Sequence, residues 1–393
     1  MTAPSPTPSP TPSRASAVLR APQVGRVLLG SIAGRLPTGS APLALLLFAR
    51  STMPISLAGV LVGAYTAGMA IGQPMLARLA DRWRQPPVMW AAAAGSTAGF
   101  ALIAFVPGVG VAIVAAALAG LGAPPFEACL RVLWKDLVAE RLLPAAYTVD
   151  VTFQELIFIL GPVATVTAVG VGGPRAGLFT AAAIQLIGTL VFTTAPSVRR
   201  WRGEAAVRHW AGPLRSGRLR LLLAATVLVG FAVGATTVAV TNYAEVAGKP
   251  SAAGWLLAAQ AFGSLLGGIG FARRQPKDQQ RALPLIVGIL AIGYLPLLSV
   301  APLPIMAGCL VLSGLTLPPM LTSVFLSTDQ VAPAGTAAEA FAWVATAFSV
   351  GSAIGSAIDG TLVGTVHLPV IGFTLAPLAI VIAAVLLWSR RNR

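Results

Sequence analysis

The sequence predicts an all-α protein that crosses a membrane many times and consists of two similar halves. Of its 393 residues, 56% are hydrophobic and 10% are charged, and the mean hydropathy is +0.81. A chain of this composition has too few polar side chains to cover a water-soluble globule. Its apolar runs repeatedly reach the roughly 20 residues that a helix needs to cross a bilayer.

Two segments of the first half return in the second half. Gly120-Leu-Gly-Ala-Pro-Pro-Phe126 returns as Gly314-Leu-Thr-Leu-Pro-Pro-Met320, 194 residues later. A second pair, 59–78 and 254–273, shares glycines and alanines at a spacing of 195 residues. Two matches at nearly the same spacing predict an internal duplication, with two pseudo-symmetric six-helix bundles.

Each expected transmembrane helix is an apolar run that ends at charged residues or at a Pro/Gly break. We expect residues 1–20 to form a disordered cytoplasmic tail, because they are rich in Pro, Ser and Thr and lack the apolar core of a secretory signal. The other expected parts are an N-terminal bundle (21–195), a basic cytoplasmic linker (196–218), a C-terminal bundle (219–389) and a basic C-terminus (390–393). The twelve runs cover about 24–49, 54–77, 87–106, 108–133, 145–171, 174–195, 219–243, 252–272, 282–300, 302–327, 337–365 and 368–388.

Basic residues gather on one side of this topology. Arginines and lysines fill the loops on the side of the 196–218 linker, whereas only Arg50, Arg175 and Lys249 lie opposite. Because cytoplasmic loops carry an excess of Lys and Arg, both termini are expected in the cytoplasm. The preference for Arg over Lys, with abundant Ala, Gly and Pro, indicates a GC-rich bacterial genome, so we expect a bacterial cytoplasmic membrane.

The composition and motifs also argue against several classes of function. The net charge of +15 does not indicate a nucleic-acid partner, because the basic residues occupy short loops and not one face of a soluble domain. His209 and His367 are isolated in loops, and the sequence has no metal-ligand spacing, Asp-rich pyrophosphate motif or ATP-binding loop. We therefore expect no enzyme, no metal and no cofactor. Cys129 and Cys309 lie in apolar runs and are interpreted as small core residues.

One loop motif connects the twelve-helix pattern with a known family. The loop after the second helix reads Ala77-Arg-Leu-Ala-Asp-Arg-Trp-Arg-Gln-Pro86. The major facilitator superfamily of secondary transporters has Gly-x-Leu-Ala-Asp-Arg-x-Gly-Arg-Lys there, so the Leu-Ala-Asp-Arg core is kept while both glycines and the terminal basic pair are replaced. The chain thus resembles this superfamily over nearly its whole length after the tail, which implies the MFS fold and alternating access.

Asp81 and Arg82 in this motif are candidates for a conformational latch. Asp81 can lie at the positively polarised N-terminus of the eleventh helix, near Gly335 and Thr336, and Arg82 can pair with cytoplasmic acids. Such contacts would stabilise the state that is closed on the cytoplasmic side. A generic charged turn is the alternative.

Weaker matches concern the fourth and fifth helices. The stretch 120–123 resembles the glycine end of the family's helix 4 motif, but Ala116 replaces the arginine of that motif. Gly161-Pro162 resembles the motif of proton-driven antiporters without its other glycines. The resemblance implies proton-coupled efflux of a small hydrophobic or amphipathic compound, by a monomer with protons and the lipid bilayer as its other partners. Proton-coupled uptake of a small anionic metabolite and a non-cycling transporter-like receptor stay open.

Ionisable side chains within the spanning helices are the main site candidates, because each is costly unless it lines a cavity or has a partner. Arg35 and Glu155 lie at similar depths in helices 1 and 5, so we expect them to pair, as a proton-coupling site or as a structural ion pair. A contact with an anionic substrate is a further possible role of Arg35. Loss of Arg35 from the pair would favour a proton on Glu155 through desolvation. Asp359, closer to the outer surface and without an evident partner, is a secondary proton-site candidate.

Four further charged residues are candidates for the cavity or its gate. Glu127 and Arg131 are four residues apart in helix 4, which places them on one face as a structural salt bridge or a gate contact. Asp150 and Glu339 lie at matching places near the cytoplasmic ends of helices 5 and 11, where we expect water to reach them. Stabilisation of a helix N-terminus is the alternative role of these two acids.

Neutral polar residues within the apolar runs are candidates for substrate contacts. Tyr65 and Gln73 lie in helix 2, Asn242 in helix 7 and Gln260 in helix 8. Hydrogen bonding between packed helices is the commoner role of such side chains in membranes.

Overall fold

Helices make up almost all of the described chain in this computed structural model, which describes residues 14–53, 55–203, 211–249, 252–273, 279–366 and 369–389. Within these ranges the structure contains α-helices and short 3₁₀ turns and no β-strand. Twelve helical segments of the described chain are long and apolar enough to cross a membrane. The predicted fold class and number of spans are confirmed.

In the described part of the first half, a short helix precedes six of the candidate spans. Its helices are α1 (Arg14–Arg20), α2 (Val24–Thr52), α3 (Ile55–Arg82), α4 (Gln85–Phe105), α5 (Val109–Leu121), α6 (Phe126–Leu137), α7 (Leu143–Gly172) and α8 (Pro174–Thr193), with a 3₁₀ turn η1 (Glu140–Leu142) before α7.

The linker contains the short helix α9 (Pro196–Arg200) and the 3₁₀ turn η2 (Gly212–Arg215). The second half provides the other six candidate spans. Its elements are α10 (Gly217–Val246), α11 (Ala252–Arg273), α12 (Gln279–Tyr294), η3 (Leu295–Ser299), α13 (Leu303–Gly314), α14 (Leu317–Val331), α15 (Ala337–Val366) and α16 (Pro369–Ser389).

The prediction of a disordered tail is wrong for its last residues. Residues 14–20 form α1, and Val18 of this helix is completely buried in the hydrophobic core. The apolar Ala-Ser-Ala-Val-Leu stretch between Arg14 and Arg20 gives this helix a side that packs onto the bundle. Residues 1–13 of the tail, 204–210 of the linker and the basic terminus 390–393 lie outside the described residues.

The repeated Pro-Pro sequences interrupt one span in each half. The span Val109–Leu137 consists of α5 and α6 with a break at 122–125, and the span Leu303–Val331 consists of α13 and α14 with a break at 315–316. Proline lacks a backbone N–H group and disfavours helical backbone at the residue before it. Each Pro-Pro pair therefore ends one helix and lies at the start of the next.

Equivalent glycines pack the same helix pairs in the two halves. Gly120 of α5 lies directly against the backbone of α3 at Tyr65, and Gly314 of α13 lies against the backbone of α11 at Gln260. The absence of side chains allows these helices to approach closely, so the residues that define the repeat also define its packing. The reciprocal contacts are made by Gly68 and Gly72 in α3 and by Gly263 and Gly267 in α11.

A side chain at Gly120 is expected to push α3 and α5 apart. A Cβ atom there would overlap the carbonyl oxygen of Tyr65, which is backbone and cannot rotate away. We expect Gly120→Ala to destabilise the protein by about 1–3 kcal/mol, measured as the free energy of unfolding in SDS. Gly110→Ala is the matched control, since this glycine of the same helix has open space around it. Equal stability of the two variants would contradict the close packing.

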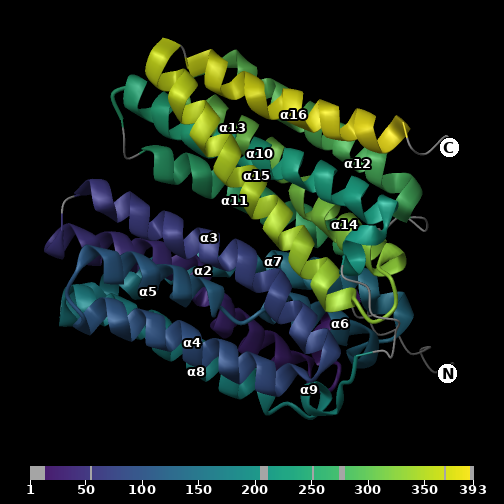
Figure 1. Cartoon of the computed structure of the whole chain (residues 1–393). Helices are drawn as coiled ribbons and strands as arrows, with labels where there is room; N and C mark the ends of the chain where they lie inside the picture. The colour runs from purple at the N-terminus through teal and green to yellow at the C-terminus, as the bar shows by residue number, and fades with distance from the viewer. Residues whose placement is uncertain are drawn as a thin grey trace, which may run out of the picture.

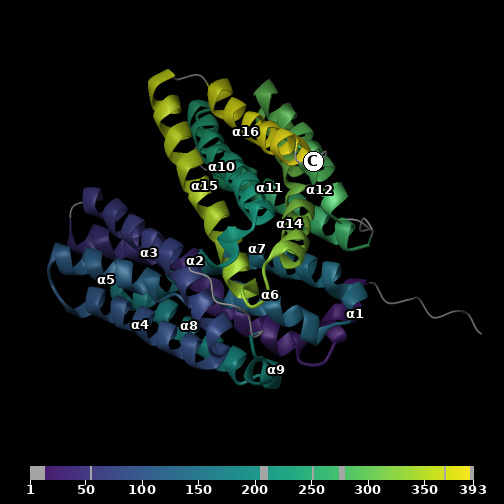
Figure 2. The same cartoon turned by 45° about the vertical axis from the view of Figure 1, so that its right-hand side comes forward.

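The two bundles come together at one end of the molecule and separate toward the other (Figures 1 and 2). The converging end carries α6, α9 and the segment 332–336 before α15, and we call it the linker end. A continuous buried core joins residues of both halves, among them Tyr147, Phe325 and Phe341. A second core, which contains Leu61 and Phe100, belongs to the first half alone. The two halves therefore share one of the two buried cores.

Candidate functional site

Four charged side chains meet inside the first bundle, and we call them the ionic cluster. Arg35 comes from α2, Glu127 and Arg131 come from α6, and Asp150 comes from α7. The carboxylate of Asp150 accepts a hydrogen bond from Nη2 of Arg35 at 2.7 Å and another from Nε of Arg131 at 3.1 Å. Oε1 of Glu127 lies 2.5 Å from Nη2 of Arg131, and its Oε2 lies 4.0 Å from Nη1 of Arg35.

The ionic cluster is balanced in charge and almost closed to solvent. The side chains of Arg131 and Asp150 are fully buried and that of Arg35 is 5% exposed, while Glu127 keeps 20% of its surface exposed. Two positive and two negative groups compensate one another. Removal of one member of such a set leaves a charge buried without a partner, which is strongly destabilising.

The predicted pair of Glu127 and Arg131 is confirmed, and the chain break before α6 explains its position. Because Pro124 and Pro125 end the preceding helix, α6 starts anew at Phe126 with Glu127 in its first turn. Arg131 follows four residues later on the same face of α6. Both side chains then face α2 and α7, where the other two members of the ionic cluster lie.

The predicted pair of Arg35 and Glu155 is wrong, since Arg35 binds Asp150. Helical side chains point toward the N-terminus of their helix, and α2 begins at the linker end, so the long Arg35 side chain carries its guanidinium toward Asp150. The sequence prediction compared only the depths of Arg35 and Glu155 along their helices and did not include the length and direction of the Arg35 side chain. Glu155 instead shares a face of α7 with Thr148 and Thr152, which lie against α14 and α11 of the other half.

Asp150 and Glu339 are more buried than the sequence predicted. The expectation that water reaches them is wrong, because Asp150 is fully buried and Glu339 is 5% exposed. Ionic partners make this burial possible. Asp150 holds two arginines of its own half, and Glu339 lies 3.7 Å from Nε of Arg78 in α3. The Arg78–Glu339 pair therefore connects the two halves.

Asp81 joins the halves at the linker end through backbone hydrogen bonds. Its Oδ1 accepts from the backbone N–H of Ala338 at 3.1 Å, and its Oδ2 accepts from that of Glu339 at 2.9 Å. These N–H groups belong to the first turn of α15, where a helix has unpaired donors and partial positive charge. The contact lies two to four residues beyond Gly335 and Thr336, at the helix terminus named by the sequence.

Other contacts at the linker end involve residues that sequence reasoning did not single out as a pair. Nζ of Lys135 in α6 lies 2.8 Å from Oδ1 of Asp329 in α14. Arg82, expected to pair with acids, is exposed and forms no ion pair with the described residues. Arg78, four residues earlier and one helical turn away, makes the ion pair instead.

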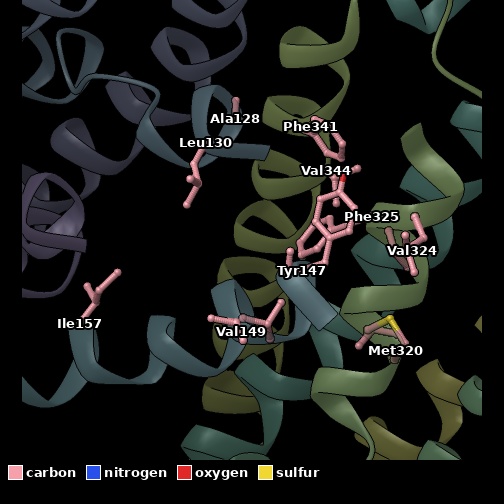
Figure 3. Packing of buried hydrophobic residues seen from close by; sticks show 14 of the residues in the cluster. Ala128, Leu130, Tyr147, Val149, Ile157, Met320, Val324, Phe325, Phe341 and Val344 are labelled. Carbon is pink, nitrogen blue, oxygen red and sulfur yellow. The ribbon is translucent and has the colours of Figure 1, made fainter. Parts of the chain in front are cut away.

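Arg131 also touches the second half. Its guanidinium carbon lies 3.3 Å from the ring centroid of Phe325 in α14, a cation–π contact. Figure 3 shows Phe325 close to Tyr147 of α7 and Phe341 of α15, and the ring centroids of Tyr147 and Phe341 are 6.0 Å apart. Arg131 thus connects the ionic cluster to the interface between the halves. Sequence reasoning missed Phe325, because one aromatic residue in an apolar helix carries no signal.

A cavity of about 230 Å³ lies beside the ionic cluster, between the first bundle and α15. Arg35 and Glu127 form part of its wall, as do Tyr65 and Gln73, two of the predicted substrate contacts. The side-chain nitrogen of Gln73 donates to the Ala123 carbonyl oxygen at 3.2 Å. The other lining residues are Gly34, Pro37, Thr38, Pro42, Thr66, Met69, Ala70, Ala123, Pro124, Phe126, Gln154, Phe158, Gln185, Ala345, Thr346 and Ser349.

The other two predicted substrate contacts do not line this cavity. Gln260 donates to the hydroxyl groups of Tyr294 at 3.4 Å and Ser313 at 3.2 Å, so it joins helices within the second half. This geometry is that of a hydrogen bond between packed helices. Asn242 lies near the end of α10 farthest from the linker end, with its side-chain nitrogen buried and without a hydrogen-bond partner in the described chain.

Gln185 of α8 is a cavity residue that sequence reasoning missed. It is buried, its Oε1 accepts from Ser96 at 3.4 Å, and its Nε2 has no hydrogen-bond partner among the described residues. A glutamine in the middle of an apolar span was the signal that could have identified it. Gln154 and Thr346 also line this cavity and were not identified from the sequence, although each is a polar residue within an apolar span.

Glu155 and Asp359 form no ion pair within the described parts of the chain. Glu155 is partly buried. Asp359 is completely buried, and neither of its carboxyl oxygens has a hydrogen-bond partner there. No group of three or more His, Cys, Asp or Glu side chains in the described ranges is arranged to hold a metal ion.

Comparison with known proteins agrees with this architecture. The solved structures with the same fold include a bacterial homologue of the iron transporter ferroportin in an outward-facing state, with TM-score 0.74 and 17% identity over 97% of this chain and 100% of that chain. The E. coli fucose:proton symporter matches with TM-score 0.71 and 14% identity over 94% and 99% of the two chains. A human organic anion transporter matches with TM-score 0.72 and 16% identity over 96% and 100%.

These identities are low, so the structural likeness shows the fold alone. No curated protein sequence matches this chain significantly. The sequence profile of the Major Facilitator Superfamily, however, matches residues 27–356. Since this match covers most of the chain and agrees with the twelve candidate spans, the chain belongs to the Major Facilitator Superfamily and is a multi-pass membrane transporter.

Proposed function

We propose that this protein is a proton-coupled secondary transporter that exports a small amphipathic or hydrophobic compound by alternating access. The observation that carries the proposal is the cavity whose wall includes Arg35 and Glu127 of the ionic cluster. Another member of the cluster, Arg131, lies against Phe325 of the second half. The cavity, the ionic cluster and the contact between the halves are therefore adjacent, an arrangement that suits alternating access.

The linker end is proposed to face the cytoplasm of a bacterium, with both termini on that side. The support is the strong excess of arginine and lysine at this end. On this assignment the contacts of Asp81 and the Arg78–Glu339 pair close the transporter toward the cytoplasm. Asp81 then acts as the latch of this state. Arg82, which is exposed, contributes positive charge to that surface.

The cavity suits a small molecule with an apolar body and one polar end. Met69, Phe126 and Phe158 supply apolar surface. At the charged end, Nε and Nη1 of Arg35 are buried without hydrogen-bond partners among the described residues, so they are available to an acceptor on the substrate. Tyr65 has a buried hydroxyl group without a hydrogen-bond partner in the described parts of the chain and offers a second hydrogen bond.

Glu155 and Asp359 are the proposed sites of proton coupling. A carboxyl group inside a membrane protein without an ionic partner is stable mainly in its protonated form. Glu155 lies on the α7 face that meets the second half, where movement of the halves changes its access to water. Asp359 is a second site, in the opposite half of the chain.

Uptake of a small anion is the alternative transport direction, and the free N–H groups of Arg35 favour it because they would bind a carboxylate well. We prefer export because Gly161-Pro162 resembles part of the motif of proton-driven antiporters. Gly161 packs closely against the α2 backbone at Gly39 and Ser40, directly beside the cavity helices. A substrate that moves against the proton flow would support export, and one that moves with it would support uptake.

Glu155→Gln is expected to lose proton-driven transport while it keeps exchange of substrate across the membrane. Glutamine preserves the size and hydrogen bonding of the side chain but cannot take up a proton. The measurement uses purified protein in liposomes, a panel of small amphipathic fluorescent compounds and small carboxylates, and pH gradients of both signs. Counterflow without a gradient reports exchange alone.

Glu140→Gln, which changes an exposed acid in η1, is the matched control and should transport like the wild type. Asp359→Asn tests the second proposed site. Full pH-driven transport by both Glu155→Gln and Asp359→Asn would refute coupling at these carboxyl groups. Absence of any transport or counterflow by the wild type would favour the non-cycling receptor.

A further inference from the structure

A second cavity lies on the outside of the first bundle, away from the interface between the halves. It has a volume of about 450 Å³ and is formed by α4, by the end of α8 and by α9. No described residue of the second half contributes to its wall, and it shares no lining residue with the cavity beside the ionic cluster. Its lining residues are Arg84, Pro86, Pro87, Trp90, Thr193, Thr194 and Arg199.

This second cavity, which we call the groove, is positively charged, and none of its described lining residues is acidic. Arg84 and Arg199 are exposed at its wall, and Nη2 of Arg84 donates to the Arg199 carbonyl oxygen at 3.2 Å, which holds the Arg84 side chain against α9. Arg26 reaches the same place, because its Nη2 donates to Oγ1 of Thr194 at 2.8 Å. None of the three arginines forms an ion pair with a residue in the described ranges. An anion is therefore the complementary ligand.

The groove lies at the depth where two candidate spans end. Arg84 directly precedes the span Gln85–Phe105, and the span Pro174–Thr193 ends at the opposite wall. Trp90, which lines the groove, is 40% exposed, and its ring nitrogen donates to Oγ1 of Thr193 at 3.1 Å. A tryptophan whose ring is exposed and whose ring N–H donates a hydrogen bond to the protein is typical of the boundary between lipid head groups and hydrocarbon.

We propose that this groove binds the phosphodiester head group of an anionic phospholipid, with an acyl chain lying along the proline and tryptophan surface. Arginines supply charged donors that pair well with phosphate oxygens. Basic pockets between membrane helices near the bilayer surface suit anionic head groups. A free phosphate would use the arginines alone and would leave Trp90 and the two prolines without apolar contact, so the lipid is the better match.

The test is lipid retention by the purified full-length protein in native mass spectrometry. Equal amounts of phosphatidylglycerol and phosphatidylcholine are added, and the expected result is a bound phosphatidylglycerol that phosphatidylcholine does not displace. In the double variant Arg84→Gln/Arg199→Gln the binding constant should fall roughly 30-fold, from the usual contribution of two basic side chains at a membrane surface. Arg84→Lys/Arg199→Lys, which keeps both charges, should retain most of the binding.

Arg218→Gln/Arg220→Gln is the matched control, since it removes two exposed arginines at the start of α10 and leaves the groove intact. Equal loss of phosphatidylglycerol from this control would overturn the proposal in favour of nonspecific attraction. Equal retention of both lipids by the wild type would overturn it as well. An added arm with inorganic phosphate separates the two sources of phosphate: displacement of the lipid by millimolar phosphate would refute the lipid assignment.

Discussion

Asp150→Ala is expected to lower the free energy of unfolding by about 3–5 kcal/mol, the typical result of breaking a buried ion pair. Asp150 is fully buried and binds both Arg35 and Arg131. Without its carboxylate, two guanidinium groups remain in a nearly dry site with Glu127 as the only other member of the ionic cluster. The unpaired buried charge, more than the two lost hydrogen bonds, accounts for the size of the effect.

Reversible unfolding in SDS, followed by tryptophan fluorescence, measures this effect. Glu140→Ala removes an exposed acid just before α7 and should stay within about 0.5 kcal/mol of the wild type. The double variant Asp150→Ala/Arg35→Met removes one charge of each sign and should recover part of the loss. If Asp150→Ala were as stable as Glu140→Ala, the ionic cluster would not be the buried network that its geometry indicates.

Asp81→Ala is expected to favour opening of the linker end by about 2 kcal/mol, which is roughly a 30-fold change in population. The Asp81 carboxylate accepts hydrogen bonds from the first turn of α15 in the other half. These donors belong to a helix N-terminus, which interacts favourably with negative charge. The contact exists only while the halves are together, so its loss destabilises the closed arrangement specifically.

Labelling of a cysteine introduced at Thr322 with a polar maleimide measures this opening. Thr322 is completely buried and lies 3.3 Å from the Thr148 hydroxyl across the interface. Asp81→Ala should label faster, and Asp81→Asn, which keeps one acceptor oxygen, should fall in between. Asp136→Ala changes an exposed acid in the same region and serves as the control. An unchanged labelling rate in Asp81→Ala would exclude a latch at this position.

Features that depend on neighbouring residues could be predicted from the sequence. The spacing of Glu127 and Arg131 was enough to predict their salt bridge, because both lie on one helix. The paired prolines lie where these two spans are interrupted, and their effect on the backbone is local. The repeated glycines predicted the duplication, and Gly120 and Gly314 occupy equivalent helix contacts in the structure.

Features that depend on how helices pack could not be predicted in this way. The partner of Arg35 depended on the direction and length of its side chain, and an error of one helical turn exchanged Asp150 for Glu155. The roles of Phe325 and Arg78 depended on contacts between halves that are distant in the sequence. Apolar and charged side chains of this kind are common in the chain, so sequence position alone does not distinguish them.

If the proposed alternating access holds, Arg131 couples the cavity to the contact between the two halves. Arg131 binds Glu127, which borders the cavity, and also lies against Phe325, which belongs to the second half of the chain. A ligand that binds Glu127 would weaken the contact between Glu127 and Arg131. Loss of the Phe325 contact would leave Arg131 held only by Glu127 and Asp150 of the ionic cluster. Thermodynamic linkage makes this communication reciprocal. Occupancy of the cavity and separation of the two bundles then both depend on the contacts of one side chain, Arg131.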